Sequence, residues 1–160
     1  MNKLRVVSNL AISMTWALVA FGLLLEIYAI PVVSQELAST YVEYSGERMT
    51  IQLLLSGLVV AGQASLVVIA LLLSRIKDRA LLEKSSANLA FILATTFLGV
   101  AALLFGLMQW LVMKNTLPPA IAIFLVVSIL LSAIASLVTF SLTEVLKEAT
   151  RARVELERVI

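Results

Sequence analysis

The chain has 160 residues, of which 61% are hydrophobic and 14% are charged, with a formal net charge of +2. Soluble domains carry about 25% charged residues, so this composition excludes an ordinary soluble protein and predicts an integral membrane protein. Histidine and cysteine are both absent, which excludes disulfides and thiol chemistry and removes the most frequent general base and metal ligand.

Four apolar runs reach the length of roughly 20 residues that a helix needs to cross a hydrocarbon core. They cover residues 6–33, 50–74, 87–113 and 120–142. The first run is too long for the apolar part of a signal peptide. The pattern predicts an all-α polytopic membrane protein. Residues 1–160 form one four-span domain, an antiparallel up-down transmembrane bundle, and a helical tail over 143–159 extends the last helix into the cytoplasm.

The basic residues predict the orientation of these spans. Of the 12 lysines and arginines, two precede the first run, four lie between the second and third, and four follow the fourth. Only Arg48 and Lys114 remain for the opposite side. Since cytoplasmic loops are enriched in basic residues, both chain termini are expected in the cytoplasm.

The last quarter of the chain predicts one long helix that begins in the membrane and ends in water. Residues 120–159 contain neither glycine nor proline, and residues 120–142 carry no charge. Such a helix measures roughly 60 Å. Its cytoplasmic part has three open fates: packing on the chain's own loop, pairing with a second copy, or docking on another protein. Apolar and small residues recur along it at alternating steps of three and four, which defines an apolar stripe: Ser128, Leu131, Ala135, Val138, Leu142, Val145, Ala149, Ala152, Leu156 and Val159.

Each run also carries a ridge of small residues. Close backbone approach through such residues holds helices together in lipid, so the ridges are predicted packing seams, or else contacts between copies. They are Ser8, Ala11, Thr15 and Gly22 in the first run, Gly57, Ala61 and Ser65 in the second, Gly99, Ala102 and Gly106 in the third, and Ser128, Ser132 and Ser136 in the fourth.

Three polar side chains within the runs are candidates for function. Glu26 lies near the outer end of the first run, where it either faces the bundle as a ligand or proton site or reaches water, Arg48 or Lys114. Gln52 and Gln63 share one face of the second run. Gln63 lies near mid-membrane and is predicted to bond a hydroxyl across the bundle, such as that of Thr95 or Ser132.

The second candidate region is a cytoplasmic contact surface. In the tail, ion pairs are expected between Arg151 and Glu155 and between Arg153 and Glu157. No catalytic constellation, metal cluster or phosphate-binding loop is visible, so neither an enzyme, a cofactor nor direct nucleic-acid binding is expected. The contact surface combines the loop after the second run with the tail: Arg75, Lys77, Arg79, Lys147, Arg151, Arg153 and Leu156.

Two segments carry a resemblance to a known family. They are the link Leu81-Leu82-Glu83-Lys84-Ser85-Ser86-Ala87-Asn88-Leu89 and the helix extension Leu142-Thr143-Glu144-Val145-Leu146-Lys147-Glu148-Ala149. With four spans, the chain resembles the domain of unknown function 2975 family of small bacterial membrane proteins. The resemblance implies a bundle in the bacterial inner membrane, accompanied by small helix-turn-helix regulators encoded nearby. It implies no activity and no site residues.

Three functions are therefore open. The leading hypothesis is a non-enzymatic membrane protein that acts through protein–protein contact at its cytoplasmic face, as a tether or regulator of a soluble or membrane partner or of a second copy. The first alternative is a small-molecule or ion transporter that uses Glu26, Gln52 and Gln63. The second is an accessory or lipid-binding subunit of a membrane complex.

Overall fold

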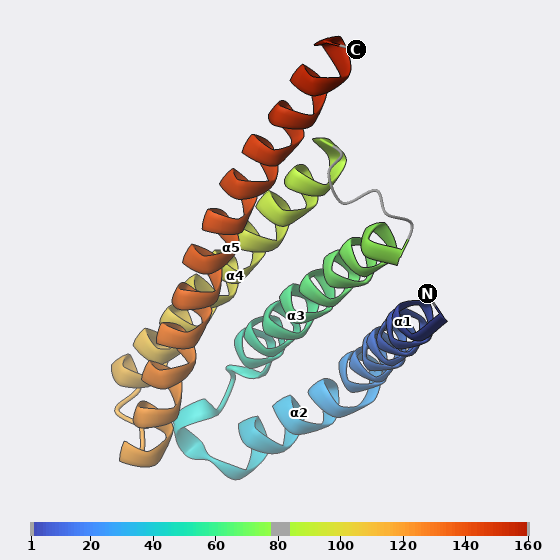
Figure 1. Ribbon diagram of the computed structural model, residues 1–160. Coiled ribbons are helices and arrows are strands. Elements are labelled where there is room, and N and C mark those ends of the chain that lie inside the picture. Colours follow the sequence, from blue (N-terminus) through green and yellow to red (C-terminus); the bar gives the residue numbers. More distant parts are fainter. Residues whose placement is uncertain (1, 78–83, 160) are drawn as a thin grey trace.

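The computed structural model describes residues 2–77 and 84–159, so the predicted site residue Arg79 lies outside the described residues. Within this part every regular element is a helix or a helical turn (Figure 1). The elements are α1 (Asn2–Leu24), the π-helical turn η1 (Leu25–Ala29), α2 (Ile30–Thr40), the 3₁₀ turn η2 (Val42–Tyr44), α3 (Arg48–Lys77), α4 (Lys84–Met113) and α5 (Pro119–Val159).

Four helical segments are long and apolar enough to cross a membrane: Val6–Thr40, Arg48–Lys77, Ser85–Met113 and Pro119–Glu155. The first is longer than the predicted run, because the helix continues past Val33 to Thr40. Only 11–17% of the most apolar stretch in each segment is buried inside the protein. The apolar surface is therefore mostly turned outward, as expected when the surrounding solvent is lipid.

The first segment bends where Pro31 enters the helix. Proline has no backbone N–H, and its ring collides with the preceding turn. The helix widens just before it, and the N–H of Ile30 donates to the carbonyl of Leu25, five residues back. Glu26 lies within this wide turn. Figure 1 shows α2 leaving α1 at an angle beyond this point.

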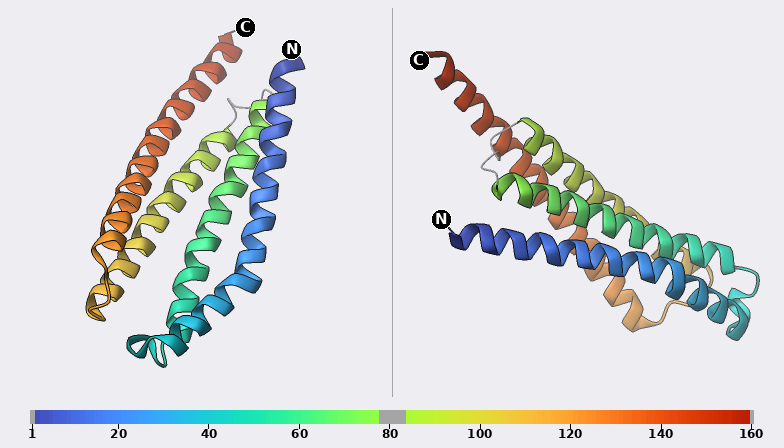
Figure 2. Two further views of the ribbon diagram at one scale, coloured as in Figure 1. Left: turned by 90° about the horizontal axis from the view of Figure 1, so that it is seen from below. Right: turned by 90° about the vertical axis from the view of Figure 1, so that its right-hand side faces the viewer.

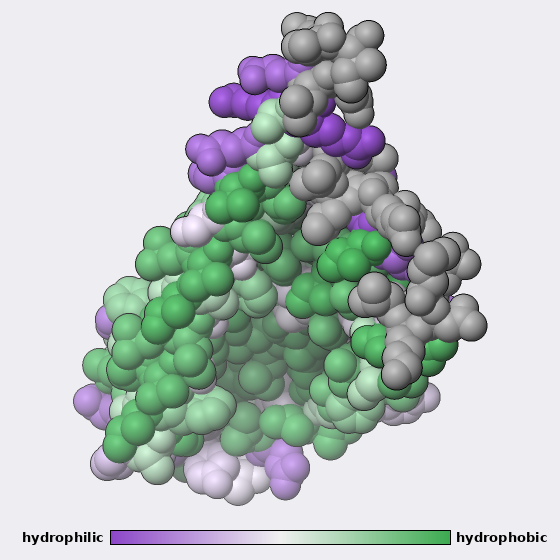
Figure 3. Space-filling model, in the orientation of Figure 1, coloured by the Kyte–Doolittle hydropathy of each residue, from purple (hydrophilic) through white to green (hydrophobic). Residues whose placement is uncertain are grey.

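The long helices form an open row. Helix α5 packs along α4, α4 along α3, and α3 along α1 and α2, whereas no comparable contact joins α1 to α5 among the described residues. Figure 2 shows the helices side by side in this order. The space-filling view in Figure 3 shows a hollow, apolar face between α5 and the α1–α3 pair. The four-helix arrangement is thus open on one side.

The most extensive contact joins α4 and α5. Ala87 and Ala90 of α4 are almost fully buried against Leu146 of α5. The hydroxyl of Ser136 donates to the backbone carbonyl of Ala94 over 2.8 Å. Small side chains let the two backbones approach, and this hydroxyl adds a bond that lipid cannot replace.

The small-residue ridges are confirmed in part. Ser8 and Thr15 of α1 are buried, and so is Ser136 in the fourth ridge. The prediction that the ridge of the third run packs against another helix of the chain is wrong, because Gly99 and Gly106 face open space. Alanines on another side of α4 make its contacts instead, because an alanine methyl group is small enough for close approach.

The end of the row opposite the termini is held by aromatic and ionic contacts. The ring of Tyr44 stacks on that of Trp110 with centroids 5.6 Å apart. The ammonium of Lys114 lies 2.7 Å from the carboxylate of Glu47. Hydrogen bonds from Lys114 and then Thr50 hold the pKa of Glu47 below its ordinary value of 4.5. These contacts hold the α2–α3 connection against the end of α4.

Candidate functional site at the start of α4 and the C-terminal part of α5

The main candidate site is a cavity of about 560 Å³, here called the α4–α5 cavity. It lies at the end of the helix row that carries both termini (Figure 1). Helix α5 has 41 residues and α4 has 30, so α5 is about 17 Å longer than α4. The part of α5 that extends beyond the start of α4 forms one wall of the cavity. The cavity is lined by Ala87, Asn88, Lys147, Thr150, Arg151, Val154 and Glu155.

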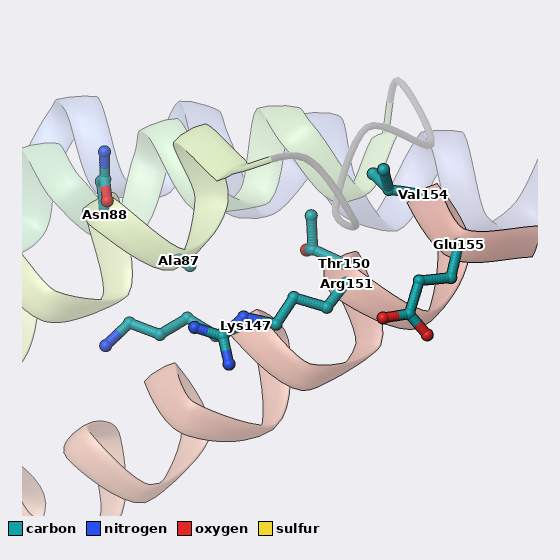
Figure 4. A pocket seen from close by; sticks show the side chains of 7 residues that line it. All are labelled: Ala87, Asn88, Lys147, Thr150, Arg151, Val154 and Glu155. Atoms are coloured by element: carbon teal, nitrogen blue, oxygen red, sulfur yellow. The ribbon is translucent and has the colours of Figure 1, made fainter. Parts of the chain in front are cut away.

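Two cations and the carboxylate of Glu155 carry the charge of this cavity. Lys147 and Arg151 lie one turn apart on α5, and Figure 4 shows both side chains in the cavity wall. The ammonium of Lys147 also lies 2.7 Å from the carboxylate of Glu144. The first turn of α4 lies at the same place, and the backbone N–H groups of a helix start attract negative charge. The arrangement suits an anionic group that approaches from solvent.

The ion pair predicted between Arg151 and Glu155 does not form. Figure 4 shows the guanidinium of Arg151 turned away from the carboxylate of Glu155. Exposed pairs at this spacing contribute only about 0.3–0.5 kcal/mol, so the long side chain is free to adopt another rotamer. The side chain of Glu157, the predicted partner of Arg153, lies outside the described residues.

The other residues of the predicted contact surface are distributed over the same end of the molecule. Arg75 is half-buried and Lys77 is exposed in the last turn of α3, and Arg153 is exposed on α5. The side chain of Leu156 lies outside the described residues. Figure 1 places the end of α3 beside the start of α4. The cationic residues therefore gather at one end, and among those that the structure describes Lys147 and Arg151 line the cavity.

The sequence prediction omitted several lining residues. Asn88 and Thr150 are polar and reach the cavity. Thr150 could have been found from its spacing, because it continues a series of hydroxyl residues on α5, Ser136, Thr139 and Thr143, that are buried against α4. Asn88 carries no such signal, since its position depends on how α4 meets α5.

The stripe of apolar and small residues predicted for the last helix lies on α5 and is called the α5 stripe, and much of it is exposed among the described residues. Val145 is 60% exposed and Leu142 is 49% exposed. The face of α5 that packs on α4 lies one residue further along, at Ser136, Thr139, Thr143 and Leu146. The loop on which the stripe was predicted to pack, one of its three fates, lies mostly outside the described residues, so that fate stays a prediction.

Gln63 takes a different neighbour from the one predicted. Its amide lies against Gly22 of α1, where an added Cβ atom would come within 2.7 Å of the Gln63 Nε2 atom. That nitrogen is buried and has no hydrogen-bond partner among the described residues. Thr95 instead donates to carbonyls of its own helix. The predicted bond across the bundle is wrong because α1, rather than α5, lies beside this face of α3.

The remaining intramembrane candidates lie apart from one another. Gln52 lines a cavity of about 490 Å³ at the start of α3 with Gly46, Arg48, Met49, Leu53 and Ser56. Eleven residues separate it from Gln63, about 16 Å along the helix. Glu26 is half-buried in η1. Lys114 is paired with Glu47, so the predicted alternative of a Glu26–Lys114 pair is not formed.

One comparison with known proteins places the chain in a family. The family described as "Protein of unknown function (DUF2975)" matches residues 32–160. The chain belongs to this family. The matched part contains α3, α4 and α5 with the α4–α5 cavity, whereas Glu26 precedes it. No curated protein and no solved structure matches the chain.

Proposed function

We propose that this DUF2975 protein is a non-enzymatic adaptor of the bacterial inner membrane that binds a cytoplasmic protein at the α4–α5 cavity. In this proposal the four helices cross the membrane up and down, both termini are cytoplasmic, and the partner offers an acidic segment. The adaptor tethers or restrains that partner at the membrane.

The observation that carries this proposal is the pair of cations in a cavity beyond the apolar part of α5. Lys147 and Arg151 line it, whereas residues 120–142 carry no charge. Charge-assisted hydrogen bonds to a carboxylate are about twice as strong as neutral ones. The apolar wall formed by Ala87 and Val154 adds a surface for a small apolar side chain of the same segment.

The orientation is supported by the distribution of basic residues. Figure 1 shows the N terminus, the end of α3, the start of α4 and the C-terminal end of α5 at one end of the row. That end carries most of the basic residues, including Arg75 and Lys77. The positive-inside tendency places such an end in the cytoplasm, where a soluble partner can reach the cavity.

The transporter alternative has less support. It requires Glu26, Gln52 and Gln63 to line one path, yet Gln52 lies in a cavity at the start of α3 and Gln63 lies against Gly22. The α4–α5 cavity, by contrast, joins two cations and two helices in a single place.

Partner capture from the native membrane tests the proposal. The double variant Lys147→Glu/Arg151→Glu is compared with wild type and with Arg48→Glu, an exposed charge at the opposite end of the row. Reversal of both charges is expected to weaken partner recovery about thirtyfold, from roughly 0.5 kcal/mol for each of two attractions lost and two repulsions gained. Removal of residues 148–160 is expected to abolish recovery.

Three results would contradict the proposed binding site or the proposed orientation. Equal recovery of every partner by the double variant, the truncated protein and wild type would show that no partner binds here. Loss of recovery with Arg48→Glu as well would point to a general charge effect rather than to this cavity. A fluorescent tag on the C terminus that is quenched only from outside intact cells would refute the proposed orientation.

A further inference from the structure

The α5 stripe stays apolar beyond residues 120–142, which form the charge-free part of the helix. Among residues 144–155 the exposed apolar side chains are Val145 and Ala152, which belong to the stripe, and Val154, which lines the α4–α5 cavity. The remaining exposed positions are charged. Apolar side chains that recur on one side of a charged helix require a covering partner.

The spacing of the stripe is that of a two-helix seam. Its steps alternate between three and four residues from Ser128 to Val159, which is the seven-residue repeat of a coiled coil. The repeat continues for roughly four and a half heptads, above the three to four that such a seam requires. Small residues at every second heptad, Ala135 and Ala149, allow close approach between helices in lipid.

Among the described residues, α4 is the one helix with extensive contacts to α5, and the exposed part of the stripe lies beside that contact. Helix α4 covers the neighbouring side of α5, at Thr139, Thr143 and Leu146. One residue corresponds to a rotation of about 100° around a helix. A second helix can therefore lie on the stripe without displacing α4.

The charges that border the stripe are complementary in a parallel pair. Glu148 directly precedes Ala149 of the stripe, and Arg153 directly follows Ala152. In a parallel coiled coil, flanking residues of this kind face each other across the seam with an offset of five residues. Glu148 of one helix then faces Arg153 of the other, twice by symmetry. In an antiparallel pair, residues that precede the stripe face residues that precede it, so Glu148 and Arg153 would not meet.

We infer that α5 pairs, parallel and in register, with α5 of a second copy of this chain along the stripe. The parallel direction rests on the proposed membrane insertion, because copies inserted the same way in one bilayer present their α5 helices in the same direction. Pairing brings two α4–α5 cavities into one assembly. A cytoplasmic partner with two acidic segments would then bind both cavities with a high effective concentration.

Single cysteines test the pairing, since the chain has no cysteine of its own. Val138→Cys lies on the stripe and Leu137→Cys beside it, at the same depth and with similar exposure of 63% and 67%. Val145→Cys and the neighbouring Glu144→Cys form a second matched pair. On oxidation of native membranes, each stripe cysteine is expected to give at least five times more covalent dimer than its neighbour.

A charge exchange tests the direction and register. In the Val145→Cys background, Glu148→Lys and Arg153→Glu each place like charges across the seam, and each is expected to reduce the covalent dimer at least threefold. The two substitutions together restore opposite charges and are expected to restore the dimer. Both positions are exposed, and substitutions at exposed positions usually change the stability of a fold little.

Three results would overturn the inference. They are equal dimer from stripe and neighbouring cysteines, a failure of the combined exchange to restore the dimer, and cross-linking of the stripe to a different protein. Partner capture with Lys147→Glu/Arg151→Glu is measured on the same membranes. Loss of the partner with an unchanged dimer supports both proposals, whereas loss of the dimer with a retained partner removes only the pairing.

Discussion

Replacement of Ser136 by alanine removes a hydrogen bond between α4 and α5 at a site closed to water. The Ser136 side chain is 2% exposed, and its hydroxyl donates to the Ala94 carbonyl over 2.8 Å. A carbonyl oxygen has two lone pairs, and that of Ala94 lies inside a helix, so the variant leaves no unpaired acceptor. Interhelical bonds in membranes contribute about 0.6–1.7 kcal/mol, and we expect Ser136→Ala to lose roughly 1 kcal/mol, about fivefold in the unfolding equilibrium.

Ser141 provides the matched control. Its hydroxyl donates to the Leu137 carbonyl of its own helix over 3.1 Å, at an exposed position. Ser141→Ala is therefore expected to change stability by less than about 0.5 kcal/mol. Ser136→Val is expected to lose more than Ser136→Ala, since extra methyl groups in a closed site cost about 1–3 kcal/mol.

The assay is reversible unfolding of the purified protein in mixed micelles with increasing sodium dodecyl sulfate, followed by circular dichroism. The expected order of stability is wild type and Ser141→Ala, then Ser136→Ala, then Ser136→Val. If Ser136→Ala is as stable as Ser141→Ala, the bond between the helices makes no net contribution. If Ser136→Val is as stable as wild type, the space between α4 and α5 at this position can hold the extra methyl groups.

Two further predictions concern other polar contacts. Gln63→Met replaces the buried, unpartnered amide by an unbranched apolar side chain and is expected to leave stability unchanged or raise it by about 1 kcal/mol, with Gln52→Met as the neutral control. A loss of more than about 1 kcal/mol in the same titration would show that the amide has a bonding partner. The lowered pKa of Glu47 means that its contact with Lys114 stabilises the fold above the ordinary carboxyl pKa and is lost as pH falls through the folded pKa. Stability should thus fall less between about pH 6 and pH 3.5 in Lys114→Met than in wild type, and an equal fall would show that this pair is not coupled to folding.

The apolar helices could be predicted from the sequence because a helix that can cross a membrane needs about 20 consecutive apolar residues. Length and composition alone predicted four of them, and all four are present. The family was also recognised from short segments around α4 and α5, and the match over residues 32–160 confirms it. Lys147 and Arg151 were named as contact residues because they follow a charge-free helix, and both line the α4–α5 cavity.

The side of each helix that packs on its neighbour could not be predicted from length and composition. In lipid, leucine and valine are equally stable against a neighbouring helix or a lipid chain, so the most apolar stripe of α5 does not indicate the contact with α4. The hydroxyl and small residues Ser136, Thr139 and Thr143 make that contact. Equally, Gln63 lies against Gly22 because the helices form an open row in which α1, and not α5, is the neighbour of α3.

Sequence by itself determined which segments are helices that can cross a membrane and which end of the chain gathers the positive charge, since both follow from residue type summed along a segment. Tertiary structure alone decided which helix each face meets, how α5 runs past the start of α4 to form a cavity, and which described positions of its apolar stripe are exposed. Those features depend on close contact between specific side chains from distant parts of the chain, which composition and periodicity do not record.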